Sequence, residues 1–335
     1  MNQRDPAETK LLVFASHPFT LWRPPVELAE RIRQRWPRMR VVHAARTEDF
    51  VAEIPDTDIL AGIHLRLAQF QLARRLQWIH STAAGVAQLM YPELRDSGVV
   101  MTNASGVHAI PMAEHVVGMM VALAHNFPGA MRNQLRGRWA QQEMWDGPAR
   151  PSELFERVAL LVGFGAVGRA VAERLGPFGM KVWAVTRSGN ADPALVSRAL
   201  PAAELDAALP GADFVILAAP ETPETRHMIG ERQLALMKPS AFLLNVARGS
   251  LVDEAALIAA LQRRAIAGAG LDVAATEPLP PESPLWTLEN VLITPHTSGN
   301  SERLWEREGD LLMDNLERWF SGRPLRNQVD KTRGY

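Results

Sequence analysis

Short apolar runs alternate with amphipathic stretches along most of the chain. In the first third, the apolar runs are short enough to be buried strands, and the stretches between them carry apolar residues at helical spacing. The predicted strands are 11–16, 39–45, 59–63, 78–82 and 99–103, and the predicted helices are 25–36, 68–76 and 91–96. Because strands and helices alternate, this part predicts a parallel sheet covered by helices on both faces.

A second alternating series follows an amphipathic stretch that predicts a long helix over 111–125. Its predicted strands are 158–162, 181–186, 214–218, 241–246, 267–273 and 291–293, and its predicted helices include 253–264, with 301–320 after the last strand. A chain of 335 residues is too long for one ordinary core. The two series therefore predict an α/β protein with two doubly wound parallel-sheet domains.

Composition and charge narrow the class of protein. Apolar residues make up 47% and charged residues 22%, which is typical of a globular protein, and the formal net charge of -1 gives no basic excess for nucleic acid. The polar N-terminus does not read as a signal peptide, and no run reaches the roughly 18 apolar residues of a membrane span. We therefore expect a cytoplasmic protein with neither nucleic acid nor membrane as a partner. The absence of cysteine excludes disulfides, thiolate catalysis and Cys-ligated zinc, and we predict no metal site.

The segment VALLVGFGAVG at 158–168 runs from an apolar strand into a glycine-rich turn, and a helical stretch follows. Gly163 permits the tight turn, Gly165 lets the backbone approach a pyrophosphate, and Gly168 lets helix and strand pack closely. The helix would begin near Ala166 and Val167 and offer its free N–H groups to the phosphates. With a strand before it and a helix after it, the turn predicts dinucleotide binding rather than a glycine-rich turn that binds nothing.

The end of the next predicted strand indicates which dinucleotide binds. An NAD enzyme places Asp or Glu there, about 20 residues past the loop, to bind the ribose 2′-OH. This chain has Thr186, Arg187 and Ser188 instead. Arg187 can pair with a 2′-phosphate, and the two hydroxyls can donate hydrogen bonds to it. We therefore expect NADPH as the preferred cofactor, with NADH as the alternative if Arg187 is only a solvated loop residue.

Three polar residues follow later strands of the second series: Arg248, Glu277 and His296. The carboxyl ends of strands are where doubly wound sheets bind ligands. Arg offers bidentate, permanently charged donors that suit a 2-keto acid, and an imidazole exchanges protons near neutral pH. A carboxylate beside the imidazole favours its proton-donating form. These three residue types together predict the reduction of a 2-keto acid by hydride from nicotinamide, although each alone is more often structural.

Asp272 is a second acid that could pair with the histidine in place of Glu277, but its position inside a strand run favours a place near the cofactor. Further candidate cofactor contacts lie mostly at other strand ends. These positions are Ala219, Pro220, Val246, Ala247 and Gly299.

Several ordered segments resemble the D-isomer-specific 2-hydroxyacid dehydrogenases, in particular the NADPH-preferring glyoxylate and hydroxypyruvate reductases. The resemblance covers nearly the whole chain. The segments are STAAGVAQL at 81–89, TNASGVHAIPMAEHVVGMM at 102–120, VGFGAVGRAVAERLGPFGMKV at 162–182, APETPETRHMIG at 219–230, NVARGSLVDEAAL at 245–257, LDVAATEPLPPESPLW at 271–286, TPHTSG at 294–299 and NLERWFSGRPLRNQVD at 315–330.

The resemblance implies a flavodoxin-like substrate domain made of residues 1–104 and 298–335, with a Rossmann cofactor domain over 105–297 inserted into it. It also implies a reaction cleft between them and a homodimer formed through the cofactor domains. Arg248 would bind substrate, Glu277 would tune the histidine, and His296 would be the general acid/base. Backbone amides of Ala84 and Gly85 would hold the substrate carboxylate.

Departures from the family pattern bear on the substrate. Ala87 replaces an Asp usual in the family, and the loop 62–64 differs from that of the phosphate-binding branch, which makes phosphoglycerate an unlikely substrate. His64 in this loop could face the substrate or be an ordinary loop histidine. Glu277 argues against formate dehydrogenase, whose relatives carry Gln.

The leading substrates are therefore glyoxylate and hydroxypyruvate, with a larger 2-keto acid as the next choice. A nucleotide-sensing corepressor and a catalytically inactive binding protein are the competing classes, and the intact trio argues against both.

Overall fold

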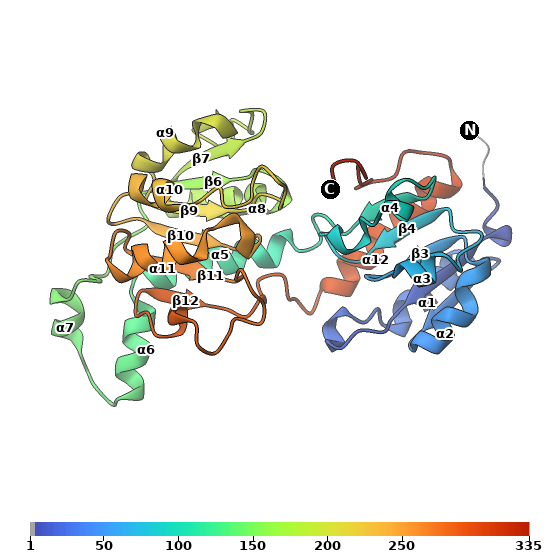
Figure 1. Cartoon of the computed structure of the whole chain (residues 1–335), viewed down its shortest axis with the longest axis horizontal. Helices are drawn as coiled ribbons and strands as arrows, with labels where there is room; N and C mark the ends of the chain where they lie inside the picture. Colours follow the sequence, from blue (N-terminus) through green and yellow to red (C-terminus); the bar gives the residue numbers. More distant parts are fainter. Residues whose placement is uncertain (1–3, 335) are drawn as a thin grey trace. The chain divides into compact units, whose positions relative to one another are not determined.

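The computed structural model describes residues 4–334, which form two compact units (Figure 1). Unit 1 comprises residues up to 108 and from 300 onward, and unit 2 comprises Ala109–Gly299. The sequence-based division at 104/105 and 297/298 differs from this one by a few residues.

Unit 1 contains one five-stranded sheet in the order β2-β1-β3-β4-β5, and all neighbouring strands are parallel. This is the flavodoxin-like strand order. Its strands are β1 (Lys10–Phe14), β2 (Arg40–Ala44), β3 (Ile59–Ala61), β4 (Trp78–Ser81) and β5 (Val100–Asn103), and its helices are α1 (Val26–Arg35), α2 (Thr47–Glu53), α3 (Leu67–Phe70), α4 (Pro92–Arg95) and α12 (Leu304–Phe320). Strands β1, β3 and β4 are buried along their whole length, as expected for a sheet covered on both faces.

The last helix of the chain completes unit 1. Leu312, Leu316 and Trp319 of α12 share a core cluster with residues of α1 and the sheet, and the Trp319 ring lies 5.4 Å from that of Trp78. Within this contact, His80 is fully buried and pairs with Glu308 of α12 at 3.0 Å. The two segments of unit 1 are therefore joined by both apolar packing and a buried polar pair.

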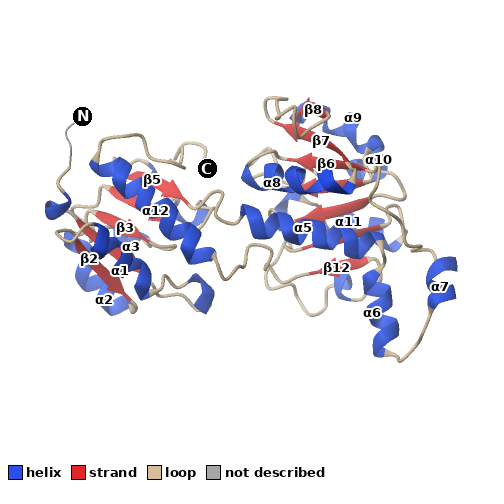
Figure 2. Cartoon of the chain, turned by 180° about the vertical axis from the view of Figure 1, so that it is seen from behind, coloured by secondary structure: helices blue, strands red, loops and turns tan. Residues whose placement is uncertain are grey.

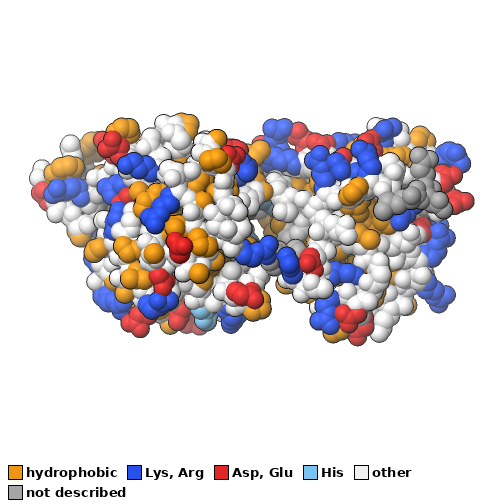
Figure 3. All heavy atoms as spheres, turned by 90° about the horizontal axis from the view of Figure 1, so that it is seen from above, with side chains coloured by type: hydrophobic (Ala, Val, Ile, Leu, Met, Phe, Trp, Pro, Cys, Tyr) orange, Lys and Arg blue, Asp and Glu red, His pale blue; other side chains and the backbone are white. Residues whose placement is uncertain are grey.

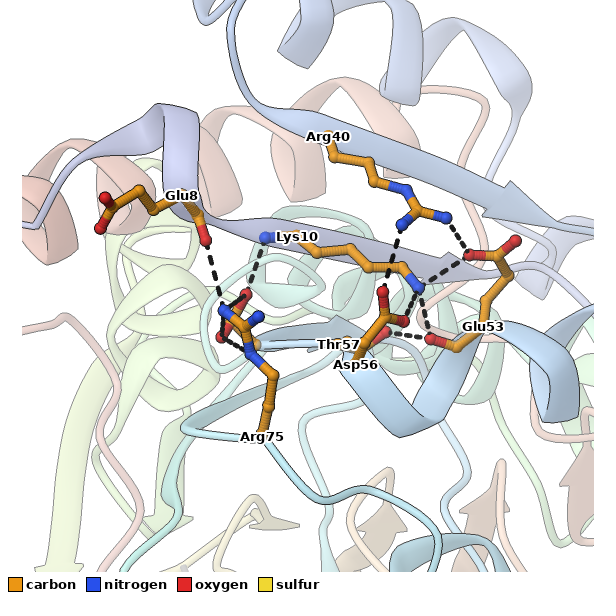
Figure 4. Close-up of polar contacts among 8 residues, drawn as sticks. Glu8, Lys10, Arg40, Glu53, Asp56, Thr57 and Arg75 are labelled. Carbon is orange, nitrogen blue, oxygen red and sulfur yellow. Dashed lines mark hydrogen bonds and ion pairs between the residues drawn. The ribbon is translucent and has the colours of Figure 1, made fainter.

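The amino ends of the unit 1 strands carry a network of ion pairs (Figure 4). Lys10 begins β1 with a buried side chain, and its Nζ donates to Asp56, Glu53 and the carbonyl of Glu53. Arg40 at the start of β2 pairs with the same two acids, at 2.9 Å to Glu53 and 3.1 Å to Asp56. The hydrogen bond from Lys10 lowers the pKa of Asp56. Opposite charges are therefore matched at this edge of the sheet.

Unit 2 contains a seven-stranded parallel sheet in the order β12-β11-β10-β9-β6-β7-β8 (Figure 2). Counted from β6, this is the Rossmann order with one added strand. The strands are β6 (Val158–Val162), β7 (Lys181–Thr186), β8 (Arg198–Pro201), β9 (Phe214–Leu217), β10 (Phe242–Asn245), β11 (Gly268–Leu271) and β12 (Val291–Ile293), and the helices are α5 (Ala109–Ala124), α6 (Phe127–Leu135), α7 (Gln141–Asp146), α8 (Ala166–Leu175), α9 (Leu205–Ala208), α10 (Glu231–Leu236) and α11 (Glu254–Gln262). The predicted fold class is confirmed.

Some elements differ from the pattern-based prediction. The helix predicted over 68–76 ends at Phe70, where the chain continues in turns that lead the buried Leu76 toward β4. Helices α6 and α7 and strand β8 were not predicted. The two helices project from the body of unit 2 and have almost no buried residues (Figure 2). Their sequences therefore lack the apolar stripe that predicts a core-facing helix.

Charged side chains of both signs are interspersed on the face that Figure 3 shows. Within residues 4–334, no helix is both long and apolar enough to cross a membrane.

Candidate active site

Arg248, Glu277 and His296 follow three neighbouring strands of the unit 2 sheet. They lie just past β10, β11 and β12, respectively, and these strands pair in that order. The carboxyl ends of parallel strands meet at one edge of a sheet, so the topology brings the three loops together. All three side chains belong to exposed residues.

The closest contact in this group is between His296 and Glu277. The Nδ1 atom of His296 lies 2.7 Å from Oε2 of Glu277. An ionised carboxylate can only accept a hydrogen bond, so Nδ1 of His296 carries the proton in this contact. The second carboxylate oxygen, Oε1, accepts the N–H of Ala274 at 3.2 Å, which fixes the acid in the loop. The Nε2 atom is therefore the ring nitrogen that can exchange a proton with a ligand.

Asp272 holds the backbone of the His296 loop. Its carboxylate accepts from the Thr294 hydroxyl at 2.6 Å, the Thr297 N–H at 2.9 Å and the Ser298 N–H at 3.0 Å. Burial would raise the pKa of Asp272, but the hydrogen bonds from Ser298, Thr294 and Thr297 outweigh it and keep the pKa below its usual value. Glu277, not Asp272, is therefore the acid on the His296 ring, and Asp272 fixes the loop that carries it.

Helix α5 reaches the same loop through His115. Its Nε2 lies 2.9 Å from the Thr294 hydroxyl, which already donates to Asp272. The hydroxyl has one proton, so His115 is the donor in this contact. Burial lowers the pKa of His115, and nearby Asp272 counteracts this only in part. The loop that carries His296 is thus tied to two elements, β11 and α5.

The Arg248 loop depends on two neighbours in the sequence. Asn245 is buried and bridges the turn, since its amide donates to the Arg248 carbonyl at 2.8 Å and its oxygen accepts the Ala247 N–H at 3.0 Å. Gly249 touches the next loop so closely that a Cβ there would lie 1.9 Å from the carbonyl oxygen of Ala274. Only glycine allows the Arg248 and Glu277 loops to approach this closely.

The glycine-rich turn has the geometry expected of a dinucleotide loop. Gly163 has a φ of +101°, and a Cβ there would lie 2.6 Å from the Ala219 nitrogen. A Cβ at Gly168 would lie 2.4 Å from the Gly163 carbonyl oxygen, so α8 and β6 pack without room for a side chain. At Gly165 nothing lies within 4 Å of the added Cβ. Because Gly165 is exposed and directly precedes α8, a phosphate fits at the open helix start, near Ala166 and Val167.

The turn after β7 carries the three residues expected near the ribose. The Thr186 hydroxyl donates to the Asn190 carbonyl at 3.2 Å, and the Ser188 hydroxyl accepts the Asn190 N–H at 3.4 Å. Thr186 is therefore used within the turn, whereas Ser188 keeps its proton for another acceptor. Arg187 is exposed at the tip.

The remaining candidate cofactor residues also lie at the carboxyl edge of this sheet or in the loop after it. Ala219 and Pro220 follow β9, and Ala219 faces Gly163. Val246 and Ala247 are buried just past β10, and Gly299 ends unit 2.

In unit 1, the loop after β4 carries Ala84 and Gly85. Its shape is set by the Asn103 amide, which donates to the Ala84 carbonyl at 2.8 Å, and by Ala104 N–H, which donates to the Ala83 carbonyl at 3.2 Å. The N–H groups of Ala84 and Gly85 have no partner within residues 4–334. Two adjacent free N–H groups can bind an anion. His64 follows the neighbouring strand β3 and is exposed.

Comparison with known proteins agrees with this geometry. The family model described as D-isomer specific 2-hydroxyacid dehydrogenase, NAD binding domain, matches residues 117–298. A glyoxylate reductase from Pyrococcus furiosus is 35% identical over 276 residues, which are 80% of this chain and 81% of the relative. The chain belongs to the D-isomer specific 2-hydroxyacid dehydrogenase family.

Two further proteins are similar to this dehydrogenase. A D-3-phosphoglycerate dehydrogenase from Methanocaldococcus jannaschii is 30% identical over 307 residues, which are 91% of this chain but 57% of the relative's length. A D-isomer specific 2-hydroxyacid dehydrogenase from Xanthobacter autotrophicus Py2, solved in complex with NADPH and MES, matches with a TM-score of 0.83 at 31% identity and covers 97% of this chain and 99% of that chain.

The family prediction is thereby confirmed, as is the assignment to NAD(P)-dependent oxidoreductases. Four residues of the candidate site were given no role from the sequence: Asn245, Gly249, Thr294 and His115. Asn245 ends β10, Gly249 directly follows Arg248, and Thr294 lies between β12 and His296, so closeness to the predicted trio was the available signal for these three.

Proposed function

We propose that this dehydrogenase reduces a small 2-keto acid to the D-2-hydroxy acid with NADPH as the preferred reductant. The observation that carries the proposal is the His296–Glu277 pair at 2.7 Å beside the Arg248 loop. The pair supplies a proton donor, and Arg248 supplies a cation beside it. Both lie at the edge of a sheet whose glycine-rich turn leaves space for a pyrophosphate.

In this mechanism, as the family resemblance implies, the N–H groups of Ala84 and Gly85 hold the carboxylate of the keto acid, and the guanidinium of Arg248 binds the substrate. Arg248 also polarises the keto oxygen. His296 gives the proton on Nε2 to the oxygen as negative charge develops there, and Glu277 stabilises the imidazole at Nδ1 throughout. The nicotinamide, when bound, supplies the hydride. Gly163, Gly165 and Gly168 would hold its pyrophosphate, with the other strand-end residues named above around the dinucleotide.

The preference for NADPH rests on the turn after β7. Arg187 and Ser188 are both exposed there, and no acid stands between Thr186 and Asn190 to repel a 2′-phosphate. The solved relative from Xanthobacter autotrophicus is a complex with NADPH, which supports the same choice.

Glyoxylate and hydroxypyruvate are the substrates that we propose first, supported by the similarity to glyoxylate reductases. A larger 2-keto acid is the second candidate. Because the chain is also similar to a D-3-phosphoglycerate dehydrogenase, a phosphorylated keto acid must be tested as a substrate as well.

We also propose a homodimer formed through unit 2. Large apolar side chains on α6, α7 and the segment between them are exposed: Phe127, Met131, Leu135, Trp139 and Trp145, of which Leu135 is 88% and Trp139 94% exposed. Helix α6 directly follows α5 in the chain, and exposed apolar area of this extent is typical of an interface. A second copy of the chain is the occupant that we propose, because the family resemblance implies a homodimer formed through the cofactor domains.

A cytoplasmic location remains part of the proposal and is tested by fractionation.

The deciding experiment measures NADPH and NADH oxidation with glyoxylate, hydroxypyruvate, phenylpyruvate and phosphohydroxypyruvate. We expect turnover of at least one small keto acid, faster with NADPH. If none of these keto acids is turned over although NADPH binds normally, a nucleotide-sensing binding protein would be favoured instead.

A further inference from the structure

Three loops lie next to one another at the carboxyl edge of the unit 1 sheet. They follow β1, β3 and β4, which are consecutive neighbours in the sheet. Gln88 joins the last two loops, since its amide donates to the carbonyls of Ile63 at 3.3 Å and Gly85 at 3.4 Å. The β3 loop with His64 is therefore held beside the proposed carboxylate site at Ala84 and Gly85.

The β1 loop places a second histidine against His64. The rings of His17 and His64 stack with centroids 5.6 Å apart and planes 13° apart. His17 is fixed by Trp22, whose ring lies 5.2 Å away, and by Arg23, whose Nε donates to the His17 carbonyl at 2.5 Å. The Nδ1 of His17 accepts the Phe19 N–H at 3.0 Å, so in the neutral ring the proton sits on Nε2.

The charged groups that affect His64 are His17 and Arg66, and both are basic. Within residues 4–334, no ion pair connects His17, His64, Arg23 or Arg66 to an acid. Burial lowers the pKa of His64, and the positive charges of His17 and Arg66 lower it further. The opposite edge of the same sheet shows the contrast, because every cation labelled in Figure 4 has an acidic partner. An anion beside the two imidazoles would supply the missing opposite charge.

We propose that His17 and His64 form a subsite for a second carboxylate, so that among the larger 2-keto acids the enzyme prefers a short dicarboxylic acid to the monocarboxylic acid of the same length. The proposal rests on the function proposed above. Neighbouring strands are about 4.8 Å apart, so His64 lies roughly one strand spacing and His17 roughly two from the Ala84–Gly85 loop. A four- or five-carbon keto diacid spans that distance, with its first carboxylate on the amides and its second on the imidazoles. Arg66 adds long-range attraction.

The test compares kcat/KM for pairs of keto acids that differ only in the distal group. Oxaloacetate is paired with 2-ketobutyrate, and 2-ketoglutarate with 2-ketovalerate, at saturating NADPH. For the wild-type enzyme we expect the diacid to be favoured at least about tenfold in one pair, because charged hydrogen bonds discriminate strongly against an apolar isostere. The double variant His17→Leu/His64→Leu should lower that ratio about tenfold or more.

Two further variants control for folding and for general charge effects. His64→Leu alone, at an exposed position, should lower the ratio in the same direction. Arg38→Ala removes an exposed cation elsewhere in unit 1 and should leave the ratio unchanged. A wild-type ratio near one, or an unchanged ratio in the double variant, would overturn the subsite while leaving the proposed function intact. Absence of turnover with all four acids and with glyoxylate would instead overturn the proposed function.

Discussion

His296 has an unusual backbone conformation. Its φ is +53°, in the left-handed region that residues with a Cβ rarely adopt. Its N–H helps to hold this conformation, because it donates hydrogen bonds to the carbonyls of Asp272 at 2.8 Å and Thr294 at 3.0 Å. Such conformations persist only where neighbours hold them, and they concentrate at functional sites. The direction of the imidazole is thus set by backbone as well as by Glu277.

Loss of the imidazole should therefore affect chemistry and not cofactor binding. We expect His296→Ala to lower kcat by about 10²- to 10⁴-fold, the usual contribution of a general acid. NADPH affinity, measured by fluorescence titration, should change less than about threefold. Glu277→Gln keeps the shape but loses the charge, so a smaller loss of kcat is expected. Equal kcat values for the wild type and His296→Ala would show that His296 takes no part in the reaction.

Arg187 should decide between the two cofactors. A charged hydrogen bond contributes about 1.5–3 kcal/mol, so Arg187→Ala should weaken NADPH binding by about ten- to a hundredfold and NADH binding little. Lys181→Ala is the matched control, because Lys181 is exposed at the other end of the same strand. Dissociation constants for both nucleotides would check this, and an equal loss for both would contradict a 2′-phosphate contact.

At the scale of elements, the contact between the β10 and β11 loops sets the spacing of the site. Gly249→Ala would place a Cβ 1.9 Å from the Ala274 carbonyl oxygen, and the loops must separate to accept it. Forced overpacking costs about 1–3 kcal/mol. We expect a lower melting temperature and a marked loss of kcat/KM.

Gly118→Ala is the control for this substitution. Gly118 is exposed inside helix α5 and has nothing within 4 Å of an added Cβ. Alanine there should be neutral or stabilise by up to about 1 kcal/mol. Thermal unfolding of the two variants side by side would test the assignment, and similar melting temperatures would show that the loops can move apart without cost.

Elements with a buried face were the ones that the sequence predicted well. The strands and strand-end residues follow from apolar runs and the polar positions after them, which is why Arg248, Glu277 and His296 could be placed at strand ends in advance. Asn245 and Gly249 could not, because their roles depend on contacts with other parts of the fold. The projecting helices α6 and α7 were missed because Leu135 on α6, Trp145 on α7 and Trp139 between them are exposed, and no periodic core stripe marks the helices.

At the scale of the whole molecule, those exposed side chains lead to a test of assembly. Burying a Leu or larger apolar side chain contributes about 1.5–3 kcal/mol. Leu135→Arg/Trp139→Asp should therefore raise the dimer dissociation constant by at least about a hundredfold. Sedimentation velocity would show this as a shift to the monomer. Arg74→Ala, on the surface of unit 1, should not change the assembly. A wild-type chain that sediments as a monomer would exclude the homodimer.

The split construction of unit 1 has a consequence for biosynthesis. Ribosomes release the chain in order, so Trp78 and His80 are made long before Trp319 and Glu308, their partners on α12. Unit 2, whose residues are contiguous, can complete its core first. During that interval the part of the unit 1 sheet that α12 covers is exposed, and we expect chaperones to bind it. A polypeptide that ends before α12 would contain an intact nucleotide-binding unit 2 but an incomplete unit 1. We expect proteases to degrade such a polypeptide.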